Sequence, residues 1–347
     1  MNQHFKDLLD SIDVKTTVDI NSKLLIIDGT NSFIRVFANV PSINDNGEHI
    51  GAVIGFLRSI GSLIRMVRPT RCIVVFDGIG GSVRRRKIYP EYKANRKNKM
   101  KLNRHSEFAD LIDEGESIKV QFVKLLEYLD VLPITVITVD NIEADDTIAY
   151  LCELFGDTSK ITISSTDKDY IQLVTENINI WNPIKKKYIR VVDILPTFGV
   201  EYSNYLLYRL LTGDTSDHIP GIKGIGLKTI IKSIPEIATD SLSINDLMQY
   251  CEDKINSGSS AKIYQSIINN KDQIFLNQKL MSLKPIDISA NSKLRIQEMV
   301  SNDNVGTINT KQFLKLYTRD FLNSFMKNPI DWLQDTFNSL KYARKTS

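Results

Sequence analysis

Acidic residues follow four short apolar runs of the chain, and their side chains are the ones whose clustering could do chemistry. If the runs are parallel strands of one sheet, their carboxyl ends meet at one edge, where open α/β sheets bind ligands. Seven carboxylates would then converge there. They belong to Asp28, Asp77, Glu143, Asp145, Asp146, Asp167 and Asp169.

A cluster of this kind needs cations to remain ionised. Two carboxylates about 4 Å apart repel by roughly 4 kcal/mol at an effective dielectric constant of about 20. Either their pKa values rise sharply or metal ions lie among them. Carboxylate oxygens without a neighbouring His or Cys suit Mg²⁺ or Mn²⁺ better than zinc. The sequence therefore predicts a site for hard divalent cations.

Each acid also has an ordinary structural interpretation. Asp-Gly after a strand is a common turn, and acids at the start of a helix complement its dipole. Thr166-Asp167 is typical of a helix cap. The same ending on all four runs favours the metal site over four unrelated turns.

A glycine-rich segment, 213–226, connects two expected helices and adds the acids Asp214 and Asp217. Glycines allow the backbone to turn tightly and approach a ligand, and the N–H groups at a helix start favour a phosphate. This pattern is typical of a helix-hairpin-helix element that holds a DNA backbone without reading bases. An ordinary glycine-rich connection is the alternative. The expected phosphate-binding residues are Gly221, Lys223, Gly224, Gly226 and Lys228.

A basic block between residues 84 and 104 contains ten Lys/Arg and one acid, Glu91. Alone, such a block is usually a solvated face. Here aromatic residues alternate with the cations, and Pro90 could begin a helix. A tyrosine can stack on an unpaired base while cations hold its phosphates, and a lysine near metals can stabilise a scissile phosphate. We expect 84–116 to form a loop or helical arch that stands off the body.

The elements that must position these residues alternate between strand and helix. Helical periodicity covers 50–67, 118–129 and 144–155, and strands are expected at 24–27, 72–76, 134–139 and 161–164. This order predicts an α/β fold with a mostly parallel central sheet flanked by helices. Beyond residue 200 the strand signal disappears. We therefore expect an α/β core at 1–200 and a helical region at 201–347, with the helix-hairpin-helix element at 203–233.

Composition sets broad limits on the class of protein. The 347 residues are 42% hydrophobic, and a net charge of +3 says little about partners. Three cysteines lie far apart without a CxxC pair, which favours reduced thiols and a cytoplasmic location. No apolar run reaches eighteen residues, so we expect no membrane partner.

Together these segments resemble the flap endonuclease and 5′→3′ exonuclease superfamily over about residues 24–232. The segment 181–187 and the helical tail are similar to the phage members called ribonuclease H, which suggests a phage gene and the host cytoplasm. His218 stands where many relatives have Asn, and Leu227 where many have Pro. The resemblance rests most on Phe-Asp-Gly at 76–78, Tyr-Pro-Glu-Tyr-Lys-Ala-Asn-Arg at 89–96, Glu-Ala-Asp-Asp at 143–146, Ser-Thr-Asp-Lys-Asp at 165–169 and Gly-Asp onward at 213–226.

The resemblance implies a PIN-like core with two Mg²⁺ ions, for which Mn²⁺ can substitute, and K⁺ on the hairpin carbonyls. The first Mg²⁺ would be held by Asp28, Asp77, Glu143 and Asp145. The second would be surrounded by Asp145, Asp146, Asp167, Asp169, Asp214 and Asp217.

It also implies roles in catalysis and in DNA binding. Lys93 and Arg96 would contact the phosphate that is cut, and with Asp145 they are the expected catalytic residues. Tyr92 would be the stacking residue. The arch would contact DNA through Arg84, Arg86, Tyr92, Lys93 and Arg96.

The resulting hypothesis is a structure-specific 5′-nuclease that hydrolyses DNA or RNA–DNA by a two-metal mechanism and leaves a 5′-phosphate. The expected substrates have 5′ ends, flaps or junctions, and the expected role is primer removal in replication. We expect a monomer whose tail could bind a single-strand-binding protein. One alternative is a junction-binding protein without catalysis, whose binding would not respond to EDTA. Another is a metal-dependent phosphatase, which would not explain the hairpin.

Overall fold

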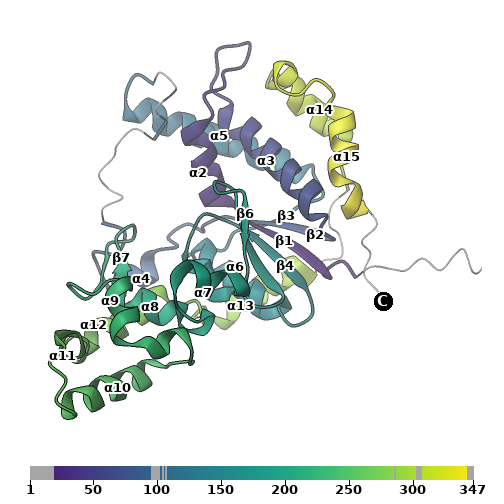
Figure 1. Ribbon diagram of the computed structural model, residues 1–347. Coiled ribbons are helices and arrows are strands. Elements are labelled where there is room, and N and C mark those ends of the chain that lie inside the picture. The colour runs from purple at the N-terminus through teal and green to yellow at the C-terminus, as the bar shows by residue number, and fades with distance from the viewer. Residues whose placement is uncertain are drawn as a thin grey trace, which may run out of the picture.

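A six-stranded sheet forms the centre of the computed structural model, which describes residues 19–94, 102–103, 105, 108–284, 287–301 and 307–341 (Figure 1). The strand order is β3-β2-β1-β4-β5-β6, parallel except for β6. The four expected strands correspond to the first four observed ones. The bounds are β1 Lys23–Asp28, β2 Arg71–Val75, β3 Thr135–Ile137, β4 Lys160–Ser164, β5 Ile178–Asn182 and β6 Lys187–Ile189.

The sequence analysis does not predict β5 and β6. Polar residues interrupt both strands, and the side chains of β5 alternate between buried and half-buried because this strand lies near the sheet edge. β6 pairs antiparallel with β5 through a short turn, so the pair forms a hairpin.

Two hydrophobic cores cover the two faces of the sheet, as the period of two along a strand requires. Leu24 and Ile26 face one core, and Leu25 and Ile27 face the other. The second core contains residues of α2 Gly29–Asn39, α3 Gly51–Val67 and α5 Leu111–Asp130. The first contains residues of α6 Ala144–Phe155 and α13 Ala290–Ser301. The mostly parallel α/β sheet with helices on both faces is confirmed.

Local capping sets the start of α5. The expected helix at 118–129 begins seven residues earlier, because the Asp110 side chain accepts hydrogen bonds from the Ile112 and Asp113 amides at 2.8 Å each. The helices expected at 50–67 and 144–155 agree with α3 and α6.

The helices after the sheet extend the first core. The predicted hairpin is present as the short strands β7 Gly213–Asp214 and β8 Ile219–Pro220. The 3-10 turns are η2 Asp169–Leu173, η3 Tyr202–Asn204, η4 Pro235–Ala238 and η5 Leu322–Ser324. The helices here are α7 Val191–Phe198, α8 Tyr205–Thr212, α9 Leu227–Ser233, α10 Ile244–Asn256, α11 Lys262–Asn269 and α12 Lys271–Met281.

The last two helices, α14 Thr310–Arg319 and α15 Pro329–Lys341, pack against α5 and α3 on the opposite face of the sheet (Figure 1). Trp332 of α15 lies over Gly61 of α3, where an added Cβ would be 3.1 Å from the indole ring. The helical tail is therefore divided between the two sides of the core.

None of the helices in the described ranges is both long and apolar enough to cross a lipid bilayer.

Candidate active site

The parallel register of β1, β2 and β4 brings acids from separate strands to one sheet edge. Leu24 to Asp28 pair with Arg71 to Val75, and Lys23 to Ile27 pair with Lys160 to Ser164. At the carboxyl ends of these strands lies a cavity of about 320 Å³. Its charged lining residues are Asp28, Arg35, Asp77, Lys93, Glu143, Asp145 and Asp167.

Asp28 is the most enclosed acid at this edge and is only 6% exposed. It caps α2 by accepting a hydrogen bond from the Asn31 amide at 3.0 Å, and it also accepts from Ser165 and Tyr170 hydroxyls at 3.1 Å each. Burial raises the pKa of Asp28 to about 7, and the charges of Asp167 and Asp77 add to this effect. The Asp28 carboxylate is thus held in place by three hydrogen bonds, and Arg35 lines the same cavity.

The start of α6 supplies a compact group of carboxylates. The ligand-capable oxygens of Glu143, Asp145 and Asp146 lie within 4.8 Å of one another. Asp77 joins this group because its side chain accepts a hydrogen bond from the Ala144 amide at 2.7 Å. Burial raises the pKa of Asp77. The helix N-terminus therefore fixes both its own acids and the acid that follows β2.

The remaining predicted acids lie on the side of the helix-hairpin-helix element. Arg209 of α8 donates to Asp169 at 2.9 Å and also to Asp214. Burial raises the pKa of Asp169 to about 7, with a further contribution from the charge of Asp167. Asp217 lies 3.8 Å from the Lys93 ammonium. The structure therefore brings all nine sequence-predicted carboxylates into one continuous region.

Arg85 is the cation that organises the group at α6, and sequence reasoning missed it. Its side chain is 2% exposed and donates to Asp146 at 2.8 and 2.9 Å and to Glu143. Lys93 also donates to Glu143. Burial opposes the charge of Glu143, yet Arg85 and Lys93 outweigh it and lower its pKa. Arg85 lies in a run of four adjacent cations, and the sequence pattern does not indicate that only this one of the four is buried.

Three further residues in the site were not predicted. Tyr170 donates a hydrogen bond to Asp28, and Arg209 donates to both Asp169 and Asp214. Arg35 of α2 lines the cavity, and its Nε and Nη2 atoms are buried without a hydrogen-bond partner among the described residues. The available signals were a cation five residues before Asp214 and another six residues after the start of α2.

The basic stretch differs from the expectation. The helix is α4 Val83–Ile88, which ends before Pro90, and residues 90–93 form turns. Tyr92 is 2% exposed and donates to Glu143 at 3.1 Å, so the ring is not presented for stacking on a base in this conformation. The hydrogen bond to a buried carboxylate is the physical reason.

The other predicted arch residues have separate environments. Arg84 pairs with Asp146 at 3.2 Å and Asp287 at 2.7 Å, whereas Arg86 is exposed. The predicted catalytic residue Arg96 lies outside the described residues.

The glycines of the helix-hairpin-helix element have two different roles. An added Cβ at Gly221 would be 2.2 Å from the Thr212 carbonyl oxygen, so this glycine is required for packing within the hairpin. Gly224 has φ +80° and, like Gly226, has open space around its Cβ position. Ile222 and Ile225 are buried and anchor the loop. Lys223 and Lys228, the two predicted phosphate-binding lysines, are exposed on it.

The charges and donor types of the site fit hard divalent cations. Among the described residues, nine carboxylates face five cationic side chains, Arg35, Arg84, Arg85, Lys93 and Arg209. Arg84 is also shared with Asp287, so carboxylates outnumber these cations by at least four, which favours the uptake of divalent cations. The available donors are carboxylate oxygens, which Mg²⁺ and Mn²⁺ prefer. Burial is the main cause of the raised pKa values of Asp28 and Asp169, and the charges of neighbouring carboxylates add to it.

Comparison with known proteins identifies the same two-part organisation. Residues 23–199 match the model of the 5′-3′ exonuclease N-terminal resolvase-like domain, and residues 200–302 match the 5′-3′ exonuclease C-terminal SAM fold. The 5′-3′ exonuclease of Aquifex aeolicus is 36% identical over 60% of this chain and 67% of its own length.

A longer relative and a solved structure also match most of this chain. DNA polymerase I of Caldicellulosiruptor bescii is 31% identical over 78% of this chain, which spans only 30% of that polymerase. A solved structure of bacteriophage T5 flap endonuclease in a complex with DNA and metal ions has a TM-score of 0.59. It is 22% identical, and the match covers 86% of this chain and 99% of that one. This likeness concerns the fold.

A resolvase-like sheet with an acidic site at its carboxyl edge, followed by a helical domain, defines a class of metal-dependent nucleases. The chain belongs to the 5′-3′ exonuclease family.

Proposed function

We propose that this chain is a structure-specific 5′-nuclease that uses two Mg²⁺ ions to cut DNA or RNA–DNA during primer removal in replication. The carrying observation is the set of nine carboxylates around one sheet edge, which outnumber the cationic side chains there by at least four in the described part of the chain. Two divalent cations bound there would neutralise this excess and supply a nucleophile from water. Asp28, Asp77, Glu143 and Asp145 would hold one ion. Asp145, Asp146, Asp167, Asp169, Asp214 and Asp217 would surround the second.

The cationic side chains would position these acids and the substrate. Arg85 keeps Glu143 and Asp146 in place, and Arg209 does the same for the acids next to the hairpin. Lys93 lines the cavity and donates to Glu143. Its ammonium could turn to a non-bridging oxygen of the scissile phosphate and stabilise the charge that builds there. Arg96 is proposed to act beside it.

The helix-hairpin-helix element would hold the duplex part of the substrate. Open backbone at Gly224 and Gly226 and exposed Lys223 and Lys228 support contact with phosphates. A K⁺ ion on the hairpin carbonyls would strengthen this contact. The relatives named DNA polymerase I and the nuclease solved with DNA support DNA as the substrate and replication as the setting.

We further propose a cytoplasmic monomer. The three cysteines are buried free thiols, which supports a reducing compartment. A single-strand-binding protein is the proposed partner of the helical tail.

Asp145→Asn is the first test of the proposed function. The variant loses one charge between the two proposed ion positions, so cleavage of a 5′-labelled flap in Mg²⁺ should fall at least 1,000-fold, on the order of 4 kcal/mol in barrier. Binding of the same flap in EDTA should be kept. Near-normal turnover would rule out the assignment of Asp145.

A panel of substrates separates the alternatives. A flap, a nicked duplex and an RNA–DNA hybrid, each incubated with wild-type protein and Mg²⁺, should yield products with a 5′-phosphate. A junction-binding protein without catalysis would retain the DNA and yield no product from any of them.

A further inference from the structure

The β5–β6 hairpin carries an exposed basic tip that the proposed function does not use. Lys185, Lys186 and Lys187 are consecutive, and all three are exposed. Ile184 precedes them and is 67% exposed. No acid among the described residues forms an ion pair with Lys185 or Lys186. The charged groups that face Lys187 are Asp193 and, through it, Arg190, which binds Asp193 at 3.0 Å.

The tip lies at the same sheet edge as the candidate active site. β5 is parallel to β4, with Ser164 opposite Trp181, so both strands end at that edge. The Ser165 amide donates to the Trp181 carbonyl at 3.2 Å, and the Ser165 hydroxyl donates to Asp28 at 3.1 Å. Two strand spacings, about 10 Å, separate β1 from β5. This distance corresponds to roughly three nucleotides along one strand of B-DNA.

The hairpin holds its tip in a defined conformation. The Asn182 side chain accepts hydrogen bonds from the amides of Ile184 at 3.1 Å and Lys185 at 2.9 Å. Trp181 and Tyr188 pack edge to face across the hairpin, with ring centroids 5.0 Å apart. Lys186 has a left-handed φ of 49°, which turns the chain back into β6. The lysines therefore extend from a braced turn.

The tip and the helix-hairpin-helix element are separate elements of the fold, and the side chains of the β5–β6 hairpin alternate between the two faces of the sheet. Trp181 packs against the core that contains α2 and α3, whereas Ile189 packs against the other core. Ile222 and Ile225, which anchor the other element, belong to the core on the opposite face. In Figure 1 the β5–β6 hairpin rises toward α2, whereas β7 lies below, beside α9.

We propose that Lys185, Lys186 and Lys187 bind the sugar-phosphate backbone of the substrate near the carboxylates, at a place separate from the helix-hairpin-helix element. This inference rests on the proposed function, because it needs a nucleic acid at the carboxylates. The tip makes ionic contacts and reads no sequence, since lysines on a turn outside a groove meet phosphates before base edges.

The test is the triple variant K185Q/K186Q/K187Q. Binding of a fluorescein-labelled 5′-flap DNA is measured by anisotropy in EDTA, which prevents cleavage, between 50 and 200 mM NaCl. The variant should bind about 10-fold more weakly or worse at the lowest salt. The slope of log Kd against log salt should fall by about 2 to 3, because each lost phosphate contact removes about 0.9. Replacing all three by Arg should restore both values.

A matched control distinguishes the loss of the tip lysines from a general effect of removing positive charge. K311Q/K315Q/K327Q removes three exposed lysines from the C-terminal helical segment, away from the carboxyl edge, and should bind like wild type. Equal losses in the tip and control variants would overturn the proposal, as would an unchanged Kd and slope in the tip variant. Failure of wild-type protein to bind the flap would instead overturn the proposed function.

Two further substrates identify which part of the backbone the tip holds. A blunt duplex and a single strand of the flap sequence are titrated with both proteins. A loss seen with the duplex alone assigns the tip to the duplex beyond the junction. A loss seen with the single strand alone assigns it to the flap, and both results support the proposal.

Discussion

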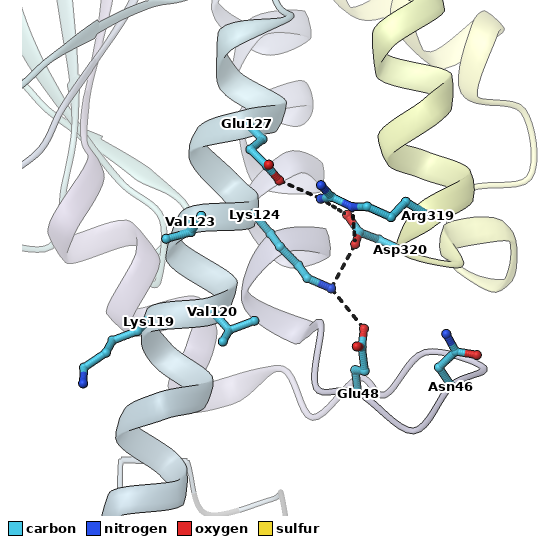
Figure 2. A pocket seen from close by; sticks show the side chains of 9 residues that line it. All are labelled: Asn46, Glu48, Lys119, Val120, Val123, Lys124, Glu127, Arg319 and Asp320. Atoms are coloured by element: carbon cyan, nitrogen blue, oxygen red, sulfur yellow. Dashed lines mark hydrogen bonds and ion pairs between the residues drawn. The ribbon is translucent and has the colours of Figure 1, made fainter.

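Two groups of charged residues in this protein bring carboxylates and cations together and differ in their electrostatics. One is the candidate active site at the carboxyl edge of the sheet. The other joins the C-terminal helices to the core, where Lys124 of α5 binds Asp320 at 2.9 Å and Glu48 at 3.0 Å. Figure 2 shows this second cluster, with Arg319 reaching Asp320 at 2.9 Å and Glu127 at 2.7 Å.

The pKa shifts separate the two clusters. Asp320 is fully buried, but hydrogen bonds from Arg319 and Lys124 outweigh the cost of burial and lower its pKa. In the active site, burial raises the pKa of Asp28 to about 7 and that of Asp146 to about 6 despite nearby arginines. The second cluster is balanced by its own cations and is structural. In the active site the carboxylates outnumber the cationic side chains, which is typical of a site that takes up cations.

The largest expected effect is a loss of rate that leaves the fold intact. Lys93→Ala should lower kcat on a 5′-flap by about 100- to 1,000-fold, because it removes a donor from the place where charge develops. Its side chain is 14% exposed, and the loss of one cation from an acid-rich site should change the thermal midpoint little in saturating Mg²⁺. Single-turnover rates and the Kd in EDTA are the measurements. A weaker Kd with an unchanged rate would make Lys93 a binding residue only.

The second cluster should respond in the opposite way. Asp320→Asn should destabilise the protein by about 2 to 4 kcal/mol, because Lys124 and Arg319 lose their shared buried partner. Urea unfolding in Mg²⁺ measures the change, and activity on the flap at 20 °C should stay near wild type. Arg319→Gln is the matched control. Its side chain is 44% exposed, so its loss should cost less than 1 kcal/mol, in the range of a surface pair.

The contrast also shows what could be predicted from the sequence. Acids after short β-branched runs identify the sheet edge, because strand direction alone brings them together. Helix α6 was predictable to its ends, since an acidic start and an apolar stripe agree. The inward turn of Arg85 and the burial of Tyr92 depend on tertiary contacts to Glu143, which local pattern does not encode. The same holds for α14, whose apolar stripe does not specify that α5 is its partner.

The last expected effect is a pH dependence of opposite sign in the two clusters. In the metal-free protein, Asp28 and Asp169 have folded pKa values of about 7, above about 3.9 in the unfolded chain. The folded state then binds more protons, so its stability should fall as pH rises from about 4 to 7. The slope is at most about 1.4 kcal/mol per pH unit for each group. Asp320, with its lowered pKa, contributes stability that is lost only as pH falls below about 4.

Urea unfolding in EDTA at pH 5, 6, 7 and 8 measures this dependence. Asp28→Asn should flatten the decline of the free energy of unfolding between pH 5 and 7. The variant should be at least as stable as wild type at pH 8, because it has no buried carboxylate at position 28 that must ionise. Saturating Mg²⁺ should also remove the decline, since cations bind the ionised acids of the folded state. A metal-free protein whose stability rises from pH 5 to 7 would show that the acids at the sheet edge are already balanced, and the difference between the two clusters would then disappear.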